Sequence, residues 1–297
     1  MTVILKVNNL TKSYGALRAV DNLSFEVKKG SVYGILGPNG SGKTTTLAML
    51  SSVVNPNGGS FQWFGKNPSA KIRQAIGTFL EKPNFYDYLS AVNNLKIVAD
   101  IKALDYSSIE PALELVGLLE RKNSKFKTYS LGMKQRLAIA SAVMGNPEVL
   151  VLDEPTNGLD PEGIAEVREL ILRLAKQGKT IIMASHLLDE VQKVCTDLLL
   201  LKSGKKVYEG GINNLSNTET KLELMSNEPS KLIEALQKYP NVEEISKENE
   251  LIIVKLKNGV DAKDVNIYLH NQGVALNHLL MHKANLEVQV LDLLKNN

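Results

Sequence analysis

The fold of this 297-residue chain is decided by one stretch, Gly37-Pro38-Asn39-Gly40-Ser41-Gly42-Lys43-Thr44. It follows the apolar run Val32–Leu36 and precedes Thr44–Val54, whose pattern predicts a helix. A strand that leads into a glycine-rich loop and then a helix is the context in which G-x-x-x-x-G-K-[ST] binds phosphate. The pattern arises by chance in only about one chain in a hundred of this length. The sequence therefore predicts an α/β fold that holds a phosphorylated ligand.

The chemistry of the loop explains its residue types. Glycines let the backbone curl so that successive N–H groups converge on an anion, and the following helix start adds unpaired N–H groups and a positive dipole end. The charge of Lys43 suits the β- and γ-phosphates of a nucleotide, and the hydroxyl of Thr44 suits Mg²⁺. The nucleotide-binding residues predicted from this loop are Gly37, Pro38, Asn39, Gly40, Ser41, Gly42, Lys43, Thr44 and Thr45.

Composition describes an ordinary soluble protein, with 43% hydrophobic and 23% charged residues. The length suggests about two domains. A formal net charge of +3 is too small to indicate nucleic acid or a membrane surface as a partner. Cys195 is the only cysteine, which excludes a disulfide framework and favours a reducing compartment. No apolar run approaches the ~18 residues of a membrane span, so we expect a cytoplasmic chain that reaches a membrane only through a partner.

Two further strands carry polar groups at their carboxyl ends. Four apolar residues from Val149 to Leu152 predict a parallel strand buried on both faces, and Asp153 and Glu154 follow it directly. Ligands bind at this edge of an open α/β sheet, where Asp153 suits a Mg²⁺ shell and Glu154 suits polarising a water. His186 ends a second buried strand at the same edge and could contact a γ-phosphate. The competing interpretations are an acidic helix start and a structural histidine.

Helix starts and one aromatic complete the candidate site residues. Asp160 is expected to cap a helix that begins at Pro161, and Ser130 to cap the helix that follows it. Gly132 keeps the first turn of that helix open to an anion. Tyr14, expected in a loop, could stack on a flat base or simply pack. The cluster Phe85–Tyr88 could likewise be a docking surface or part of the core.

The order of patterns predicts a two-domain architecture. Residues 1–211 form an α/β domain whose mixed sheet is interrupted by a helical subdomain at about residues 84–145. The stretch Gly210–Thr220 is rich in Gly, Asn, Ser and Thr, and residues 212–220 within it are expected to form a linker. Residues 221–297 show the order βαββαβ, which fits a small α+β domain of the ferredoxin-like type. The expected strands and helices of the first domain include residues 3–7, 23–27, 60–64, 76–80, 91–101, 109–119, 133–144, 198–201 and 206–208, and those of the second are residues 221–225, 229–239, 242–245, 251–256, 261–272 and 274–280.

Taken in order, the motifs resemble the ATP-binding subunit of an ATP-binding cassette (ABC) transporter, a P-loop ATPase family, over about residues 3–211. The resemblance rests on Walker A at 37–44, a signature-like Ser130-Leu131-Gly132-Met133, Walker B at 149–154, the loop Asn157–Asp160, and His186. It implies ATP and Mg²⁺ as ligands and a second copy of the chain as a partner. Two copies would pack head to tail, so that each signature acts in trans on the ATP of the other copy. Tyr14 would stack on adenine, and Asp160 belongs to the D-loop of the family.

By the same resemblance, Glu154 would deprotonate the attacking water while Lys43 and His186 hold the γ-phosphate. Two departures stand out. Leu131 and Met133 replace a glycine and a glutamine of the usual signature, and Glu81 stands where the Q-loop glutamine usually touches Mg²⁺. Thr44, Glu81 and Asp153 are therefore the expected metal ligands.

These departures and the C-terminal extension are similar to the bacterial bacitracin and peptide-antibiotic-export-like subfamily. That similarity implies an ATPase peripheral to the membrane, bound to a separately encoded permease and powering export. Two alternatives stay open: a soluble ABC-type ATPase acting on ribosomes or DNA, and a regulatory ATP binder with little turnover. One Walker A and no long heptad pattern argue against the soluble forms, and no basic cluster suggests nucleic acid. The C-terminal domain could stabilise a dimer or sense a ligand.

Overall fold

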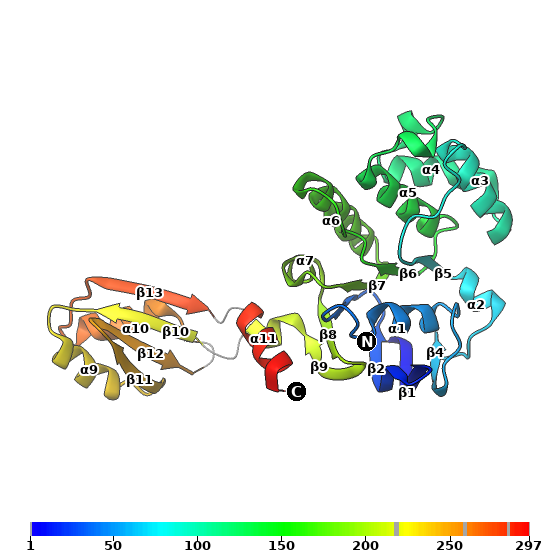
Figure 1. The fold of residues 1–297 in the computed structure, drawn as a ribbon. Coiled ribbons are helices and arrows are strands. Elements are labelled where there is room, and N and C mark those ends of the chain that lie inside the picture. Colours follow the sequence, from blue (N-terminus) through cyan, green and yellow to red (C-terminus); the bar gives the residue numbers. More distant parts are fainter. Residues whose placement is uncertain (1, 217–219, 258–259, 284–285, 297) are drawn as a thin grey trace. The chain divides into compact units, whose positions relative to one another are not determined.

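The structure, a computed structural model, describes residues 2–216, 220–257, 260–283 and 286–296. The chain divides into two compact units, Met1–Gly210 and Gly211–Asn297 (Figure 1). Of the expected linker, residues 217–219 lie outside the described residues. The linker prediction is wrong for the segment before them, because Ile212–Ser216 forms a short helix, α8.

The first unit is built on a six-stranded sheet with the order β5-β6-β7-β3-β8-β9. The five strands from β5 to β8 run parallel, and every residue of β3, β6 and β7 is buried, as their continuous apolar runs predict. Its strands are β3 (Val32–Leu36), β5 (Ile76–Phe79), β6 (Val149–Asp153), β7 (Thr180–Ser185), β8 (Asp197–Lys202) and β9 (Lys205–Gly211). The central strands therefore bring the predicted phosphate loop, Walker B and His186 to one edge.

A second, antiparallel sheet has the order β2-β1-β4, with β1 (Val3–Tyr14), β2 (Leu17–Lys28) and β4 (Gly58–Trp63). The expected short strands 3–7 and 23–27 are too short, because β1 and β2 continue through an irregular pairing at Asn9 and Asn22. Both asparagines have a φ of 52°, and the side-chain amide of Asn9 donates through Nδ2 to Asn22 Oδ1 over 2.7 Å. The two asparagines thus mark a register shift inside a hairpin, and the strands continue beyond it. Tyr14 consequently ends a strand and does not lie in a loop.

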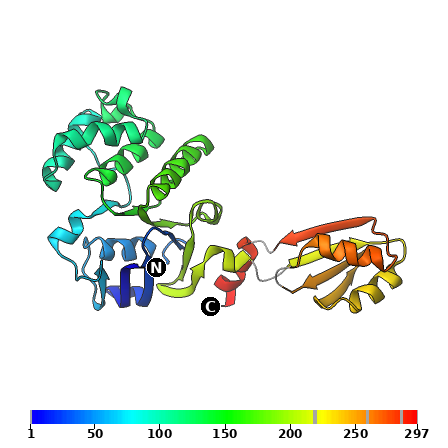
Figure 2. The same cartoon turned by 180° about the vertical axis from the view of Figure 1, so that it is seen from behind.

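Three helices of this unit form a group of their own. α3, α4 and α5 gather beyond β5 and β6, where they form the expected helical subdomain (Figures 1 and 2). The expected helix 109–119 ends early at Leu115, since Gly117 turns the chain with a φ of 67°. The expected helix 44–54 likewise ends at Leu50. The helices are α1 (Lys43–Leu50), α2 (Ala70–Gln74), α3 (Ala91–Lys102), α4 (Ile109–Leu115), α5 (Leu131–Val143), α6 (Pro161–Lys176) and α7 (Leu188–Val194), with 3-10 turns at Tyr106–Ser108, Leu119–Arg121 and Phe126–Thr128.

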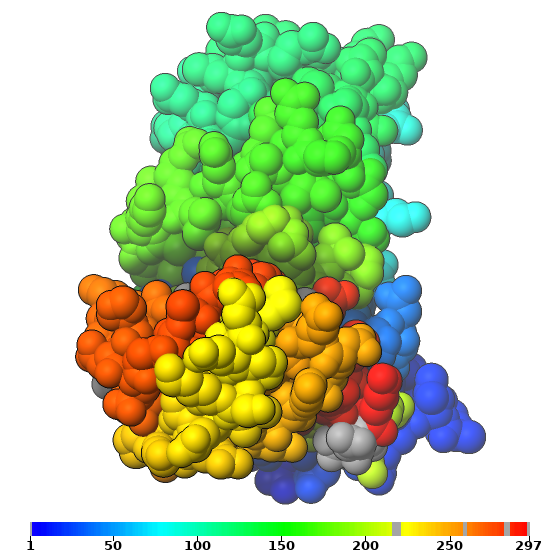
Figure 3. Space-filling view, turned by 90° about the vertical axis from the view of Figure 1, so that its left-hand side faces the viewer, coloured from blue at the N-terminus to red at the C-terminus, as the bar shows by residue number. Residues whose placement is uncertain are grey.

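The second unit contains a four-stranded antiparallel sheet with the order β11-β12-β10-β13. With α9 and α10 as its crossovers, this is the βαββαβ topology predicted from the sequence. Leu222 and Leu224 of β10 face the helices in a core shared with Ile252 and Val254 of β12. Figure 3 shows the side chains of this unit, yellow to orange, as one continuous convex surface. Its elements are β10 (Thr220–Met225), α9 (Pro229–Gln237), β11 (Val242–Glu248), β12 (Leu251–Leu256), α10 (Ala262–Asn271), β13 (His278–Lys283) and α11 (Leu286–Asn296).

Two details of this unit differ from the sequence prediction. The last strand begins at His278 and not at Val274, which packs in the core before the strand starts. The helix α11, which no pattern predicted, contacts α8 and buries Leu286 and Val290. Within the described ranges, no helix combines the length and apolar character needed to cross a membrane.

Candidate functional site

The site is assembled at the carboxyl ends of three neighbouring strands. β3 pairs with β7, and β7 pairs with β6, all in parallel. The phosphate loop follows β3, His186 follows β7, and Asp153 ends β6 with Glu154 directly after it. Lys43 and His186, which are 143 positions apart in the sequence, therefore share one edge of the sheet, as the positions of these motifs after buried strands predict.

Two glycines of the loop are required by its shape. Gly42, the residue before α1, has a φ of 99°, and a Cβ there would lie 2.4 Å from the carbonyl oxygen of Ala19. A Cβ on Gly37 would lie 2.3 Å from the carbonyl oxygen of Leu201. The loop is thus pressed against strands on both sides, which only glycine permits at these two positions. The amide of Gly204 also donates to the carbonyl oxygen of Ser41 over 3.0 Å and fixes the loop to the β8–β9 turn.

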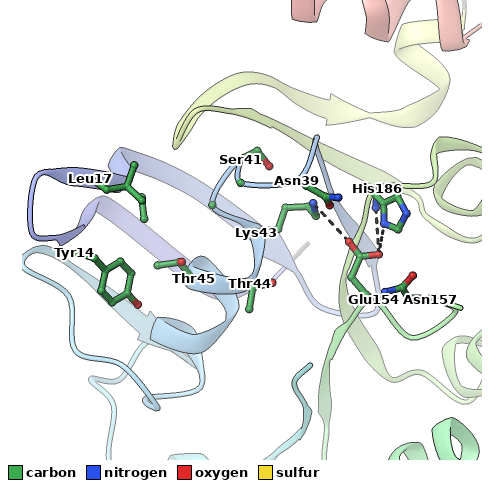
Figure 4. A pocket seen from close by; sticks show the side chains of 13 residues that line it. Tyr14, Leu17, Asn39, Ser41, Lys43, Thr44, Thr45, Glu154, Asn157 and His186 are labelled. Atoms are coloured by element: carbon green, nitrogen blue, oxygen red, sulfur yellow. Dashed lines mark hydrogen bonds and ion pairs between the residues drawn. The ribbon is translucent and has the colours of Figure 1, made fainter. Parts of the chain in front are cut away.

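Three ionisable groups form a continuous chain across the pocket (Figure 4). Lys43 Nζ donates to the Gly37 carbonyl oxygen over 2.8 Å and lies 3.6 Å from Glu154 Oε1. The other carboxylate oxygen of Glu154 lies 2.8 Å from His186 Nδ1. Lys43 is nearly buried, with 6% of its side chain exposed, whereas His186 is 34% exposed. A cation, a carboxylate and an imidazole are therefore held within direct reach of one another at the mouth of the phosphate loop.

The backbone of Glu154 supports this arrangement. Its φ of 47° is left-handed, which is uncommon for a residue with a side chain, and its amide donates to the Ala184 carbonyl oxygen over 3.0 Å. The amide of His186 approaches Glu154 Oε2 at 3.4 Å. A costly local conformation that neighbouring strands hold in place is typical of functional positions.

Asp153 lies deeper, with 1% of its surface exposed. Burial raises the pKa of its carboxyl group above the ordinary value, against a hydrogen bond with the Thr44 side chain that lowers it. Its Oδ1 atom is buried and has no hydrogen-bond partner among the described residues. An orphaned carboxylate oxygen beside a hydroxyl is a donor set that fits Mg²⁺.

Glu81 contributes charge to this region. Its carboxylate is among the groups that raise the pKa of Asp153, and its own side chain is exposed, on a backbone with a φ of 59°. Among the described residues, no three His, Cys, Asp or Glu side chains gather closely enough to hold a metal by themselves. A metal here would therefore need Thr44 and ligand oxygens from outside the chain in addition to the carboxylates.

The pocket next to this chain of groups has a volume of about 410 Å³. Eight of the predicted nucleotide-binding residues line it, and they extend from Tyr14 at one end to Lys43 at the other. The sequence did not single out Leu17 and Ala19, which reach the pocket because β2 pairs with β1 across from Tyr14. Asn157, noted only as part of a loop, also lines it. The lining residues are Tyr14, Leu17, Ala19, Asn39, Gly40, Ser41, Gly42, Lys43, Thr44, Thr45, Glu154, Asn157 and His186.

The remaining predicted residues lie elsewhere. Gly37, Pro38, Glu81 and Asp153 are not part of the pocket lining, and neither are Ser130–Met133 or Asp160. Ser130 Oγ accepts from the Met133 amide over 3.2 Å, and Asp160 Oδ1 accepts from the Gly163 amide over 2.9 Å, so both expected helix caps are confirmed.

The signature-like segment contacts the loop before Asp160 within the same chain. A Cβ on Gly158 would lie 3.1 Å from Leu131 Cδ2, and the Leu131 side chain is still 46% exposed. The structure thus joins the start of α5 to this loop. Asn157 at the start of the loop lines the pocket, whereas Ser130–Met133 do not line the pocket of their own chain.

Comparison with known proteins gives a consistent result. The family profile described as ABC transporter matches residues 20–157. The bacitracin transport ATP-binding protein BcrA of Bacillus licheniformis is 39% identical over 259 residues, which cover 85% of each chain. The lantibiotic transport ATP-binding protein SrtF of Streptococcus pyogenes is 40% identical over 225 residues, covering 76% of this chain and 97% of SrtF.

Among solved structures, an ATP-binding cassette in a dimeric post-hydrolysis state with ADP and Pi bound superposes with a TM-score of 0.64. It is 26% identical and covers 70% of this chain and 98% of its own. The predicted resemblance and the predicted fold class are both confirmed by these matches.

Proposed function

This chain belongs to the ABC transporter family of ATP-binding subunits, and on that premise we propose that the pocket between β3, β6 and β7 is where it hydrolyses ATP. The observation that carries the proposal is the contact chain from Lys43 through Glu154 to His186 beside the phosphate loop. A cation for the phosphates, a carboxylate for the water and an imidazole that orients the carboxylate are the groups that phosphoryl transfer to water requires.

Each group has a defined task in the proposed reaction. Lys43 exchanges its contact with Glu154 for the β- and γ-phosphates, and keeps its hydrogen bond to the Gly37 carbonyl oxygen. Glu154, released from the cation, accepts the proton of the attacking water, and His186 holds the carboxylate in line through the 2.8 Å contact. Tyr14, at the far end of the pocket, stacks on the adenine ring.

Mg²⁺ fits the part of the site formed by Thr44 and Asp153. Thr44 and the unpartnered Oδ1 of Asp153 would hold it together with phosphate oxygens, and Glu81 would add a further carboxylate to its surroundings. When bound, the ion supplies charge that neutralises the phosphates.

A second copy of the chain completes the site. Ser130–Met133 do not line the pocket of their own chain, and Leu131 is exposed, which supports their use on a partner's nucleotide. The N-terminus of α5, which begins at Leu131, would then present its unpaired N–H groups to the γ-phosphate held by the other copy. The dimeric cassette with which this chain superposes supports the same assembly.

The helical subdomain offers a surface for a membrane partner. The predicted aromatic cluster is divided: Phe85 packs edge-on against Phe126, whereas Tyr86 and Tyr88 are 53% and 67% exposed. Buried Asn94 fixes this loop, since its side chain accepts from the Tyr86 amide and donates to the Tyr86 carbonyl oxygen. Two rigidly presented tyrosines with ring centres 5.8 Å apart are suited to docking an amphipathic segment of a separately encoded permease.

The permease contact can be tested by purification from the native cells in detergent with a tag on the full-length chain. We expect mass spectrometry to identify a polytopic membrane protein in near-equal amount.

Changing Tyr86→Asp and Tyr88→Asp together should reduce that recovery at least about tenfold, because two charges would be buried in the interface. Tyr106→Asp, an exposed tyrosine of the same subdomain outside this loop, is the matched control. Normal co-purification of the double variant would exclude this surface, and recovery of ribosomes or DNA-processing factors would exclude transport.

Export is the direction we propose. The relatives named for bacitracin and lantibiotic transport make peptide antibiotics the first class of cargo to test. The same relatives favour a transporter over an ATPase acting on ribosomes or DNA. The permease would recognise the substrate, and this chain would bind and hydrolyse ATP at the cytoplasmic face of the membrane to drive transport.

A further inference from the structure

The strand that carries Tyr14 is attached to the loop that follows α1 by three hydrogen bonds. Lys12 Nζ donates to the Asn55 carbonyl oxygen over 2.7 Å, and the Ser13 amide donates to Asn57 Oδ1 over 2.8 Å. The Asn57 amide donates in return to the Thr11 carbonyl oxygen, also over 2.8 Å. The end of β1 is therefore held on both sides: by its pairing with β2, and by these bonds next to its pairing with β4.

Lys12 also contacts Tyr14 itself. Its ammonium nitrogen lies 5.3 Å from the centre of the Tyr14 ring, within cation–π range. Tyr14 lines the pocket and Lys12 does not, so this contact leaves Tyr14 as the pocket residue available to a base. Tyr14 is 49% exposed, so the contact with Lys12 restricts a side chain that is half open to solvent.

The loop that makes these hydrogen bonds is attached to the end of α1, because the amides of Val53 and Val54 donate to the Ala48 carbonyl oxygen. α1 begins at Lys43 in the phosphate loop and ends at Leu50, about 12 Å further along its axis, five residues before Asn55. One helix thus connects the two ends of the pocket. The phosphate loop lies at its N-terminus, and the loop that holds the strand of Tyr14 follows its C-terminus.

We propose that Lys12 is a positioning residue for the purine ring, which sets the orientation of Tyr14 and its distance from the phosphate loop. Asn57 supports it by fixing the backbone at Ser13. The inference rests on the proposed stacking role of Tyr14. Its consequence is that Lys12 contributes to binding of the base and not of the phosphates, although it carries a positive charge.

The test compares two ligands that differ in the base. Dissociation constants of the full-length protein are measured by calorimetry for ATP and for inorganic tripolyphosphate, which has the phosphates but no ring. Lys12→Met should weaken ATP binding about threefold to tenfold and leave tripolyphosphate binding unchanged. Lys12→Arg, which keeps a cation and a donor, should bind ATP like the wild type. Lys66→Met, at an exposed lysine of the same unit, is the matched control and should change neither ligand.

A double variant decides whether Lys12 acts through the ring. In a Tyr14→Ala background, Lys12→Met should cause no additional loss of ATP affinity. A loss that persists in that background, an equal loss for both ligands, or no loss at all would each overturn the proposal. Failure of the stacking role itself is distinguishable, since Tyr14→Ala alone would then bind ATP as well as the wild type does.

Discussion

ATP hydrolysis by the Glu154→Gln variant is expected to fall by about 10²–10⁴-fold, while ATP still binds. The amide keeps the size of the side chain and its contact with His186, but it cannot accept a proton from water. Lys43 keeps its hydrogen bonds to the carbonyl oxygens of Gly37 and Pro38, so the phosphate loop retains its shape. Turnover is measured by phosphate release and binding by calorimetry on the same preparation.

The control for this variant is Glu162→Gln, which removes the same charge from an exposed position in the first turn of α6. It should hydrolyse ATP within about twofold of the wild type, as expected for a surface change. Near-wild-type hydrolysis by Glu154→Gln would show that Glu154 does not accept the proton, and it would contradict the proposed role of the Lys43–Glu154–His186 contact chain.

The second large effect is expected from Gly132→Asp. No atom lies closer than 3.9 Å to an ideal Cβ at this position, so the folded chain accepts a side chain there without distortion. In the dimer, the new carboxylate would face the γ-phosphate of the partner's ATP, and repulsion between like charges costs several kcal/mol. Hydrolysis should therefore fall at least about 10²-fold, whereas the ATP affinity of the isolated subunit stays unchanged.

Gly132→Ala separates charge from size, because it adds only a methyl group to the same position. It should retain most of the activity. Equal losses in both variants would indicate that the helix start is sensitive to packing rather than to charge. A loss of ATP affinity in the isolated subunit would mean that Gly132 acts on the nucleotide of its own chain.

The sequence predicts the parts of this molecule that local rules determine. A glycine-rich loop after a buried strand, the Asp160 and Ser130 caps, and the fully buried strands β6 and β7 all depend on residues adjacent in the chain, and the structure has each of them. The order of these strands in a parallel sheet then brings Lys43, Glu154 and His186 together.

What escaped prediction depends on pairing between distant segments. Leu17 and Ala19 line the pocket because β2 pairs with β1 beyond the irregular pairing at Asn9 and Asn22, whereas the strands expected from the sequence stop at residue 7 and begin at residue 23. The helix α11 buries only two apolar side chains among its described residues, Leu286 and Val290, a weak local signal. The contact between Lys12 and Asn55 joins residues 43 positions apart and has no signature in either segment.

The most direct test of the account mixes two inactive proteins. Lys43→Ala loses the cation of its own phosphate loop but keeps its signature segment, and Gly132→Asp keeps the loop but loses the signature. In a head-to-tail dimer of the two, one composite site retains both halves. We therefore predict that the mixture recovers hydrolysis, up to about one quarter of the wild-type rate, because about half of the dimers are mixed and each has one intact site. A mixture that stays as inactive as its two components would contradict an ATP site shared between two copies of this chain.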